Sequence, residues 1–569
     1  MNTKRTSVQH RILWSSLYSP NLYYLGALLA SLASWRFVSC YRPSSSCLAL
    51  FLLTDVGVMR GRLWIVLLCV CLVVAASGCG PDSPGVRTVT GATYTGTAAS
   101  GSSTPARTVV GLTAVPATPS AVASTSTPSL GGSPVTDLDV VRHAAHPIQG
   151  DEDDYDPLIS LVGNARFVLL GEASHGTHDF YYERARITRR LIEEKGFTAI
   201  AVEGEWSQMF RVNRYIRGMS DEPNAEDILS TFTGFPAWMW NNTDVRDLAE
   251  WLKSHNDALP PFAPKVGIYG LDLYSFRESA DAVADYFDTR DPTAAKQARD
   301  RYSCLWTGKF DPADYETPAD TPLASCNTNL RQQIAELEQM RAHTETHGYQ
   351  GNRAVEREEL FSALRNAIVV KDKHDYDRAT STGPDSSWNV RDRHMANTLQ
   401  ALSEHLGVDG RPAKIVVWAH NTHVGDERGT EMAQNEEVNL GQLVREQYKD
   451  KAVLVGFTTY TGTVIAAKAW DEQGEKFNVL PAVPQSYAGL FHDAKVGNSL
   501  FILRGNDRLV EAFDEPRLQR GIGVLYLPIT ELMSHYYQSW LSKQFDAVIH
   551  IEQSSAVQPL KTAYPTPSP

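Results

Sequence analysis

Short apolar runs alternate with longer segments of helical period along most of the chain, and this alternation limits the folds it can adopt. Phe180–Glu194, for example, places Ile187 and Leu191 four residues apart between charged positions, as an amphipathic helix does. Strands that are apolar throughout are buried on both faces, which favours a mainly parallel sheet covered by helices. The runs expected to form strands are Phe167–Leu170, Ala199–Val202, Val266–Tyr269, Lys414–Trp418, Ala452–Phe457, Ser499–Leu503, Gly523–Tyr526 and Ala547–Ile551.

The stretch from Ser275 to His405 interrupts this alternation. It is long, charged and mostly helical in pattern, as in Leu330–Arg341 and Arg357–Asp372. We therefore expect a helical insertion over about residues 275–405, lying over the sheet in a position suited to a lid.

The charge of the chain bears on its partners. Its 569 residues include 53 Lys and Arg against 66 Asp and Glu, a net charge of −13, and residues 1–78 are themselves basic. The remainder is therefore strongly acidic. Because proteins that follow nucleic-acid phosphates need a basic face, we expect no nucleic-acid partner.

An export signal is predicted at residues 59–79. Met59–Arg62 supplies a basic start, Leu63–Ala75 an apolar core and Ala76–Gly78 a small-residue cleavage site before Cys79. This ending resembles a lipobox, in which Cys79 would be lipidated and become the mature N-terminus. The apolar run is short for a membrane span, which needs about 20 residues; plain secretion and a true span are the alternatives. We expect a lipoprotein anchored to a membrane of the bacterial cell envelope, with an extracytoplasmic body.

The segments around the signal complete the domain organisation. Residues 1–58 are expected either to fall outside the mature protein, because the start codon was assigned too early, or to form an extra membrane segment. Residues 80–135 are mostly Ser, Thr, Gly, Pro and Ala, which cannot bury enough apolar surface to fold. We expect a disordered tether there, a folded domain over 136–562 and a disordered tail over 563–569.

Cys304 and Cys326 are the only cysteines in the expected exported body. Neither lies in a CxxC motif, so a structural zinc site is not expected. Pairing is the norm in an oxidising compartment, and residues 309–322 between them contain three prolines and no helical period. We expect a Cys304–Cys326 disulfide, with two buried free thiols as the alternative.

Polar residues follow four of the predicted strands directly. Because ligands bind outside the carboxyl ends of parallel strands, we expect these residues to share one site. They are Glu172 and His175 after the first strand, Glu203 after the second, Asp272 after the third, and His420 and His423 after the fourth. Glu203 adjoins an apolar strand, where a carboxylate is partly desolvated and needs a partner.

Each of these residues also has a purely structural interpretation. Glu172 and His175 could cap a helix beginning near Thr177, whose hydroxyl is itself suited to the N-cap. His420 and His423 could be exposed loop residues. Familiar hydrolase motifs do not decide the matter, since the sequence has no GxSxG, HExxH, P-loop or strand-linked GxGxxG.

Six segments, in order along the chain, resemble the erythromycin esterase family. They are LGEASHGT (170–177), GFTAIAVE (196–203), VRDRHMA (390–396), WAHNTH (418–423), SHYY (534–537) and QFDAVIHI (544–551). The resemblance implies a three-layer α/β/α fold and hydrolysis of esters or lactones, since characterised family members hydrolyse the lactone of macrolide antibiotics. The natural substrate is not fixed by it.

The resemblance also implies a role for each matching residue. His175 would be the general base that takes a proton from water, with Glu172 and Glu203 holding and polarising it. Arg184, His420 and His423 would line the substrate pocket, and Asp272 is expected beside them as a further substrate-binding residue. No cofactor is expected.

Two other functions remain open. Carboxylate and imidazole groups also bind metals, so Glu172, His175, Glu203 and His420 could hold a divalent cation in a metal-dependent hydrolase. The protein could instead be a tethered, non-catalytic module that binds a lactone or glycan. Its oligomeric state is not predicted.

Overall fold

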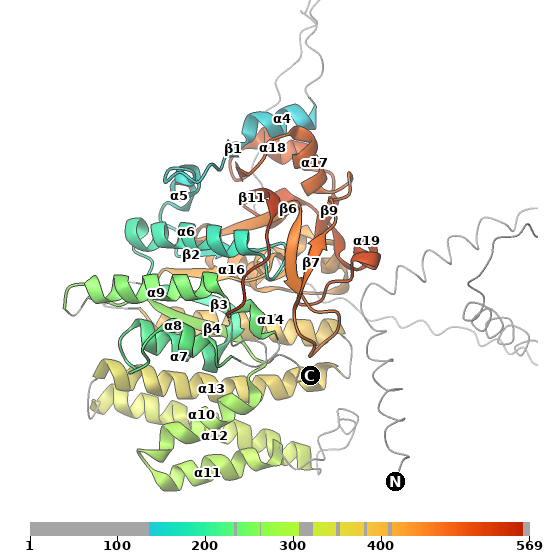
Figure 1. The fold of residues 1–569 in the computed structure, drawn as a ribbon. Coiled ribbons are helices and arrows are strands. Elements are labelled where there is room, and N and C mark those ends of the chain that lie inside the picture. Colours follow the sequence, from blue (N-terminus) through green and yellow to red (C-terminus); the bar gives the residue numbers. More distant parts are fainter. Residues whose placement is uncertain are drawn as a thin grey trace, which may run out of the picture. The chain divides into compact units, whose positions relative to one another are not determined.

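The computed structural model describes residues 136–232, 236–261, 263–305, 322–348, 353–380, 384–407 and 412–560. The expected signal with Cys79, the tether, the C-terminal tail and residues 1–58 lie outside these ranges. Figure 1 shows the described chain from α4 (Asp137–Ala144) to β11 (Ala547–Ser554).

A nine-stranded sheet runs through the described residues in the order β1-β8-β11-β6-β2-β5-β3-β4, with β7 paired to β6. From β11 to β4 in this order, neighbouring strands are parallel. The pairs that involve β1, β7 or β8 are antiparallel. The mainly parallel sheet predicted from the alternation is therefore confirmed. The strands are β1 (His146–Pro147), β2 (Phe167–Leu170), β3 (Ala199–Glu205), β4 (Gly267–Asp272), β5 (Ile415–Trp418), β6 (Ala452–Ala466), β7 (Glu475–Val479), β8 (Ser499–Ile502) and β11; β9 (Arg517–Arg520) and β10 (Tyr536–Ser539) form a separate pair.

Alternate residues of each parallel strand enter two different hydrophobic cores, one on each face of the sheet. In β2, Val168 and Leu170 join one core and Phe167 and Leu169 the other. Because all four are buried, the strand is apolar throughout rather than alternating. Helices cover both cores and complete three α/β/α layers: α5 (Asp156–Val162), α6 (His178–Lys195), α7 (Trp206–Ile216), α8 (Ala225–Leu229) and α9 (Thr243–Ala258) mainly on the first, and α4, α16 (Leu440–Tyr448), α17 (Tyr487–Ala494) and α18 (Asp507–Ala512) on the second.

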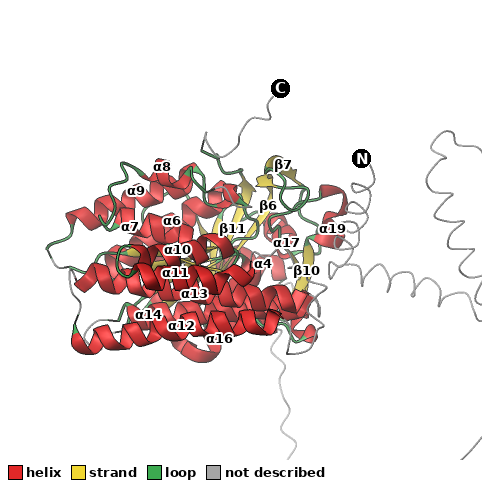
Figure 2. Cartoon of the chain, turned by 90° about the horizontal axis from the view of Figure 1, so that it is seen from below, coloured by secondary structure: helices red, strands yellow, loops and turns green. Residues whose placement is uncertain are grey.

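Five helices form the insertion expected over about residues 275–405. Figure 1 shows α10 to α13 stacked below the sheet, and Figure 2 shows the insertion helices in front of the strands. Residues of α10 to α13 build a core of their own, while α13 and α14 also contribute to a core of the sheet. No helix among the described residues has the length and apolar character of a membrane span. The insertion helices are α10 (Phe276–Asp288), α11 (Pro292–Tyr302), α12 (Pro322–His347), α13 (Arg353–Thr380) and α14 (Pro384–His405).

Of the strands expected from the sequence, two segments differ most from the expectation. β6 continues nine residues past Phe457, because its second half pairs with β7, from Gly462 opposite Val479 onward. The strand predicted at Gly523–Tyr526 was wrong. That segment makes one isolated bridge, between Leu525 and Ala467, the residue that follows β6, and it forms no strand of the sheet. Ile522, the residue before the segment, bridges Ser174 in the loop after β2.

Cys304 and Cys326 form a disulfide in the structure. Their Cα atoms lie 5.7 Å apart, within the range that a disulfide spans without moving the backbone. The bond joins the short turn after α11, at Ser303–Leu305, to the first part of α12. It fastens the outer helices of the insertion to each other.

Replacing both cysteines by serine should destabilise the protein by up to roughly 3 kcal/mol, because the bond restricts the unfolded chain across a loop of 22 residues. Thermal unfolding of the C304S/C326S protein, compared with the wild type, measures the loss. A wild-type unfolding midpoint that is the same with and without a thiol reductant would contradict a stabilising bond.

Candidate active site

The loop after β2 holds His175 through Glu172. The His175 Nδ1 and Glu172 Oε1 atoms are 2.8 Å apart, and both side chains are buried. A carboxylate can only accept here, so Nδ1 carries the proton and donates it. The lone pair of the neutral ring is therefore on Nε2, the nitrogen that lies on the side of Glu203, 3.8 Å from its Oε1.

Arg184, on the first turns of α6, fixes the other oxygen of Glu172. Its Nη2 donates to Glu172 Oε2 over 2.8 Å, and the guanidinium is fully buried between the rings of Tyr181 and Trp418. Because Oε1 of Glu172 faces His175 and Oε2 accepts from Arg184, the carboxylate is held in one orientation. Arg184 therefore positions the histidine through the glutamate.

Glu203 is buried at the end of β3, where four groups meet it. Oε1 accepts from Arg391 Nη2 over 2.8 Å and lies 3.3 Å from His423 Nε2, while Oε2 accepts from the backbone N–H of His420 over 2.8 Å. Burial alone would favour the neutral acid, but His423 and His175 hold the pKa of Glu203 well below its usual range. Glu203 is therefore a buried carboxylate.

Helix α14 adds two residues whose role the sequence analysis missed. Arg391 Nε donates to Asp272 Oδ1 over 3.0 Å, which adds β4 to the site, and Asp392 Oδ1 lies 2.9 Å from His423 Nδ1. Burial and Arg391, whose Nη1 lies 3.0 Å from His423 Nε2 and can only donate, favour the neutral ring, whereas Asp392 and Glu203 raise the pKa of His423. The segment VRDRHMA contained a signal for these two residues, because it places the charged Arg391 and Asp392 directly after the apolar Val390 in a helical pattern.

The pKa of His420 is shifted in the opposite direction to that of its neighbour His423. Its Nδ1 accepts from the backbone N–H of Thr422 and lies 2.9 Å from the Thr422 hydroxyl. Burial and the nearby His175 lower the pKa of His420 to about 3, so the ring is neutral and its proton is on Nε2. This Nε2 is buried and makes no close hydrogen bond among the described residues, although the backbone carbonyl of Ala173 interacts with the ring. The imidazole centroids of His175 and His420 are 5.0 Å apart.

The structure brings all seven predicted site residues to the carboxyl edge of β2, β3, β4 and β5. All of them are buried, so the interpretation of the histidines as exposed loop residues was wrong; they are Glu172, His175, Arg184, Glu203, Asp272, His420 and His423. Thr177 does stand at the N-cap of α6, but its hydroxyl makes no capping bond. It lies 2.6 Å from the hydroxyl of Ser174, so the two buried hydroxyl groups are hydrogen-bonded to each other.

A metal ion fits this set of donors poorly. Oε2 of Glu172 already accepts from Arg184 and Oε1 of Glu203 from Arg391, so a cation would have to compete with a buried guanidinium for each carboxylate. Protein metal sites leave their carboxylates and imidazole lone pairs free for the ion. Among the described residues, the one three-ligand acidic group lies elsewhere, at Asp151, Asp153 and Asp154.

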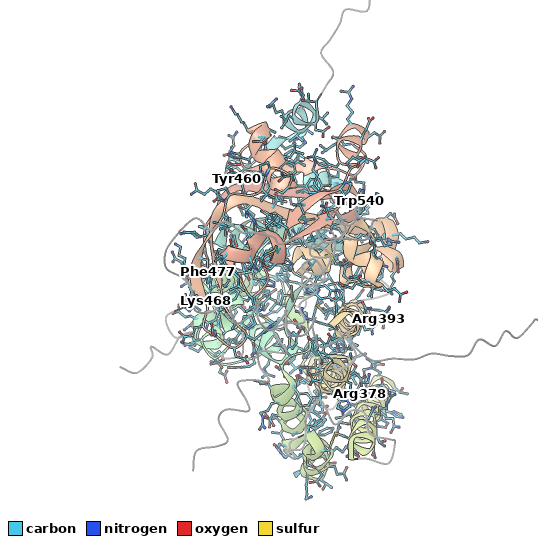
Figure 3. All side chains as sticks on the ribbon, turned by 90° about the vertical axis from the view of Figure 1, so that its right-hand side faces the viewer. Arg378, Arg393, Tyr460, Lys468, Phe477 and Trp540 are labelled. Atoms are coloured by element: carbon cyan, nitrogen blue, oxygen red, sulfur yellow. A yellow bond between two sulfur atoms is a disulfide. The ribbon has the colours of Figure 1, made fainter. Side chains whose placement is uncertain are left out.

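Arg391→Met should destabilise the protein by about 3–5 kcal/mol, because it leaves Glu203 and Asp272 buried without their shared cation. The urea concentration at half-unfolding measures this loss. Arg393→Met is the matched control, since Arg393 is exposed two residues along the same helix (Figure 3). Equal midpoints for the two variants would show that the guanidinium does not hold the site together.

Comparison with known proteins identifies the family. The model of the erythromycin esterase family matches residues 192–554. Among curated proteins, erythromycin esterase type II of Escherichia coli is 22% identical, over 72% of this chain and 94% of its own length. The putative hydrolase YbfO of Bacillus subtilis (strain 168) is 22% identical, over 69% of this chain and 85% of its own.

Solved structures share the fold. A succinoglycan biosynthesis protein superposes with a TM-score of 0.60 at 20% identity, covering 76% of this chain and all of its own. An erythromycin esterase variant in its open conformation gives 0.52 at 16% identity, covering 72% of this chain and 96% of its own. With its family model matched over more than half of its length, the chain belongs to the erythromycin esterase family of hydrolases.

Proposed function

We propose that the protein hydrolyses carboxylic esters or lactones, possible macrolide lactones among them, with His175 as the base that activates water. The observation that carries this proposal is the buried Arg184–Glu172–His175 series. It fixes the tautomer of His175 and leaves the basic Nε2 on the side of Glu203 and His420. A positioned imidazole of this kind is suited to proton transfer near neutral pH.

The neighbouring groups supply the other parts of the reaction. As water attacks the ester carbonyl, Nε2 of His175 takes its proton, and the resulting imidazolium lies between the carboxylates of Glu172 and Glu203. The carbonyl oxygen becomes an oxyanion, which needs a donor that is already in place. The Nε2–H of His420 is such a donor, because it makes no close hydrogen bond within the described residues and is already buried, so it costs little to desolvate. The protonated His175 then returns its proton to the leaving alcohol.

His175→Asn should lower kcat by about 10²–10⁴, because the amide cannot act as the base but fills similar space. Turnover on a panel of activated esters and macrolactones measures the loss. His143→Asn is the matched control, since this histidine is exposed on α4. His143→Asn should unfold at the wild-type temperature, and His175→Asn should remain folded at the temperature of the assay.

Three outcomes would contradict this mechanism. A His175→Asn protein that keeps more than about a third of wild-type turnover would exclude that residue as the base. Activity lost on prolonged chelation and restored by Mn²⁺ or Zn²⁺ would favour the metal-dependent hydrolase. Binding of a lactone or glycan without any turnover by the wild type would favour a non-catalytic module.

We also propose that the protein is exported and anchored through a lipid on Cys79. The support is the sequence alone: a basic start, an apolar core and a small-residue site before that cysteine. In this proposal the residues 80–135 tether the hydrolase outside the cytoplasm.

Cys79→Ser should release the protein from the membrane fraction or block its processing, because serine cannot carry the thioether-linked lipid. Fractionation of cells expressing the wild type and the variant, with immunodetection of the body, checks this outcome. Wild-type protein found wholly in the cytosol would contradict both the signal and the tether.

A further inference from the structure

An exposed apolar patch lies on one short segment near the C-terminal end. Among the large apolar side chains exposed in the described ranges, four fall between residues 527 and 533: Leu527 (41%), Ile529 (94%), Leu532 (56%) and Met533 (52%). Single exposed apolar residues are ordinary, whereas a contiguous group marks a surface that contacts an apolar partner. We call these four residues the apolar lip.

The apolar lip is held out on a fixed structure. It belongs to the connection of residues 521–535 between β9 and β10, which are paired from Arg520 opposite Tyr536 onward. Arg520 Nε and Glu531 Oε1 lie 2.8 Å apart with both side chains buried, and α19 (Glu531–Ser534) follows. Figures 1 and 2 place α19 at the margin of the domain. The exposure of the lip is therefore a property of the folded connection.

The same connection borders the candidate active site. The carbonyl of Ile522 accepts from the backbone N–H of His175 over 3.0 Å. A Cβ added at Gly521 would lie 3.3 Å from Cε1 of His420, so glycine lets the connection approach that ring. The first residues of the connection are therefore part of the wall beside both histidines.

One residue links this wall to the apolar lip. The backbone carbonyl of His535 accepts from Gly521 N–H over 2.9 Å, and its ring Nε2 accepts from Leu527 N–H over 3.2 Å. Burial lowers the pKa of His535 to about 4, which keeps the ring neutral and able to accept. A single residue, His535, therefore bridges Leu527, the first residue of the lip, and Gly521, whose backbone lies against His420.

From this continuity we propose that the apolar lip binds the apolar body of the ester or lactone whose carbonyl is held at His175. The inference rests on the proposed function and adds a substrate class to it: esters with a medium-length acyl chain, in preference to small esters. The rim around His175 is made of charged and polar groups, so it can orient the ester group but makes few apolar contacts with an alkyl chain. Each methylene covered by the lip strengthens binding.

The test compares the wild type with a protein carrying Ile529→Ser, Leu532→Ser and Met533→Ser. For 4-nitrophenyl octanoate, below micelle formation, kcat/KM should fall about tenfold through KM, and for 4-nitrophenyl acetate it should change less than about twofold. Val510→Ser is the control, because Val510 is an exposed apolar residue on α18 (38%), outside the connection. Equal losses on the two esters, or no loss on the octanoate, would overturn the proposal.

Two further measurements separate the lip from the reaction and from a membrane role. If the wild type hydrolyses neither ester, calorimetry measures the binding of the octanoyl and acetyl amides instead. Weaker octanoyl binding by the triple variant would support the binding role of the lip although the hydrolase proposal fails. Unchanged octanoyl binding would overturn the binding role. A membrane role is tested in the Cys79→Ser background by sedimentation with phosphatidylcholine–phosphatidylglycerol vesicles. If the triple substitution abolishes this sedimentation but does not change the preference for octanoyl over acetyl substrates, the lip binds a lipid surface and the proposal is overturned.

Discussion

The buried carboxylate of Glu203 is the interaction on which the site depends. It lies at the end of an apolar strand, and the partners that keep it charged come from α14, from the turn after β5 and from the loop after β2. A buried carboxylate without partners would cost several kcal/mol or take up a proton. The sheet edge, the insertion and the histidine loop must therefore meet correctly before Glu203 is stable, which couples assembly of the site to folding of the domain.

Two buried carboxyl groups on opposite sides of His175 support its proposed role as a base. Glu172 Oε1 lies 2.8 Å from Nδ1 of the ring, and Glu203 Oε1 lies 3.8 Å from Nε2. In the proposed reaction, the positive charge that forms on His175 during water attack would lie between these two groups. The fixed surroundings would then stabilise that charge without having to rearrange.

The sequence could predict the parallel strands and the edge where the site lies, because buried strands are apolar throughout and the residues after them are local neighbours. It could not give Arg391 and Asp392 a role, since they reach the site from a helix about 190 residues after Glu203 in the chain, and only packing brings them together. Local pattern also failed at Gly523–Tyr526, which has strand-like composition. There the backbone of Val524 and Tyr526 bonds to that of Ala467, the residue after β6, in a single bridge and not along a strand of the sheet.

The insertion was expected to sit where a lid could form, and the contacts of its helices limit which of them could move. In α14, Arg391 pairs with Glu203; in α13, the buried Glu358 pairs with Arg217 of the main body over 2.9 Å and accepts from Tyr269 over 2.8 Å. Moving either helix off the sheet would leave a buried carboxylate without its partner, at a cost of several kcal/mol. The disulfide ties α12 to the turn after α11, and these outer helices pack mainly within the core of the insertion itself. These ion pairs make α13 and α14 part of the sheet-bound framework, whereas no residue of α11 or α12 named in the site would have to separate from a partner if those helices moved.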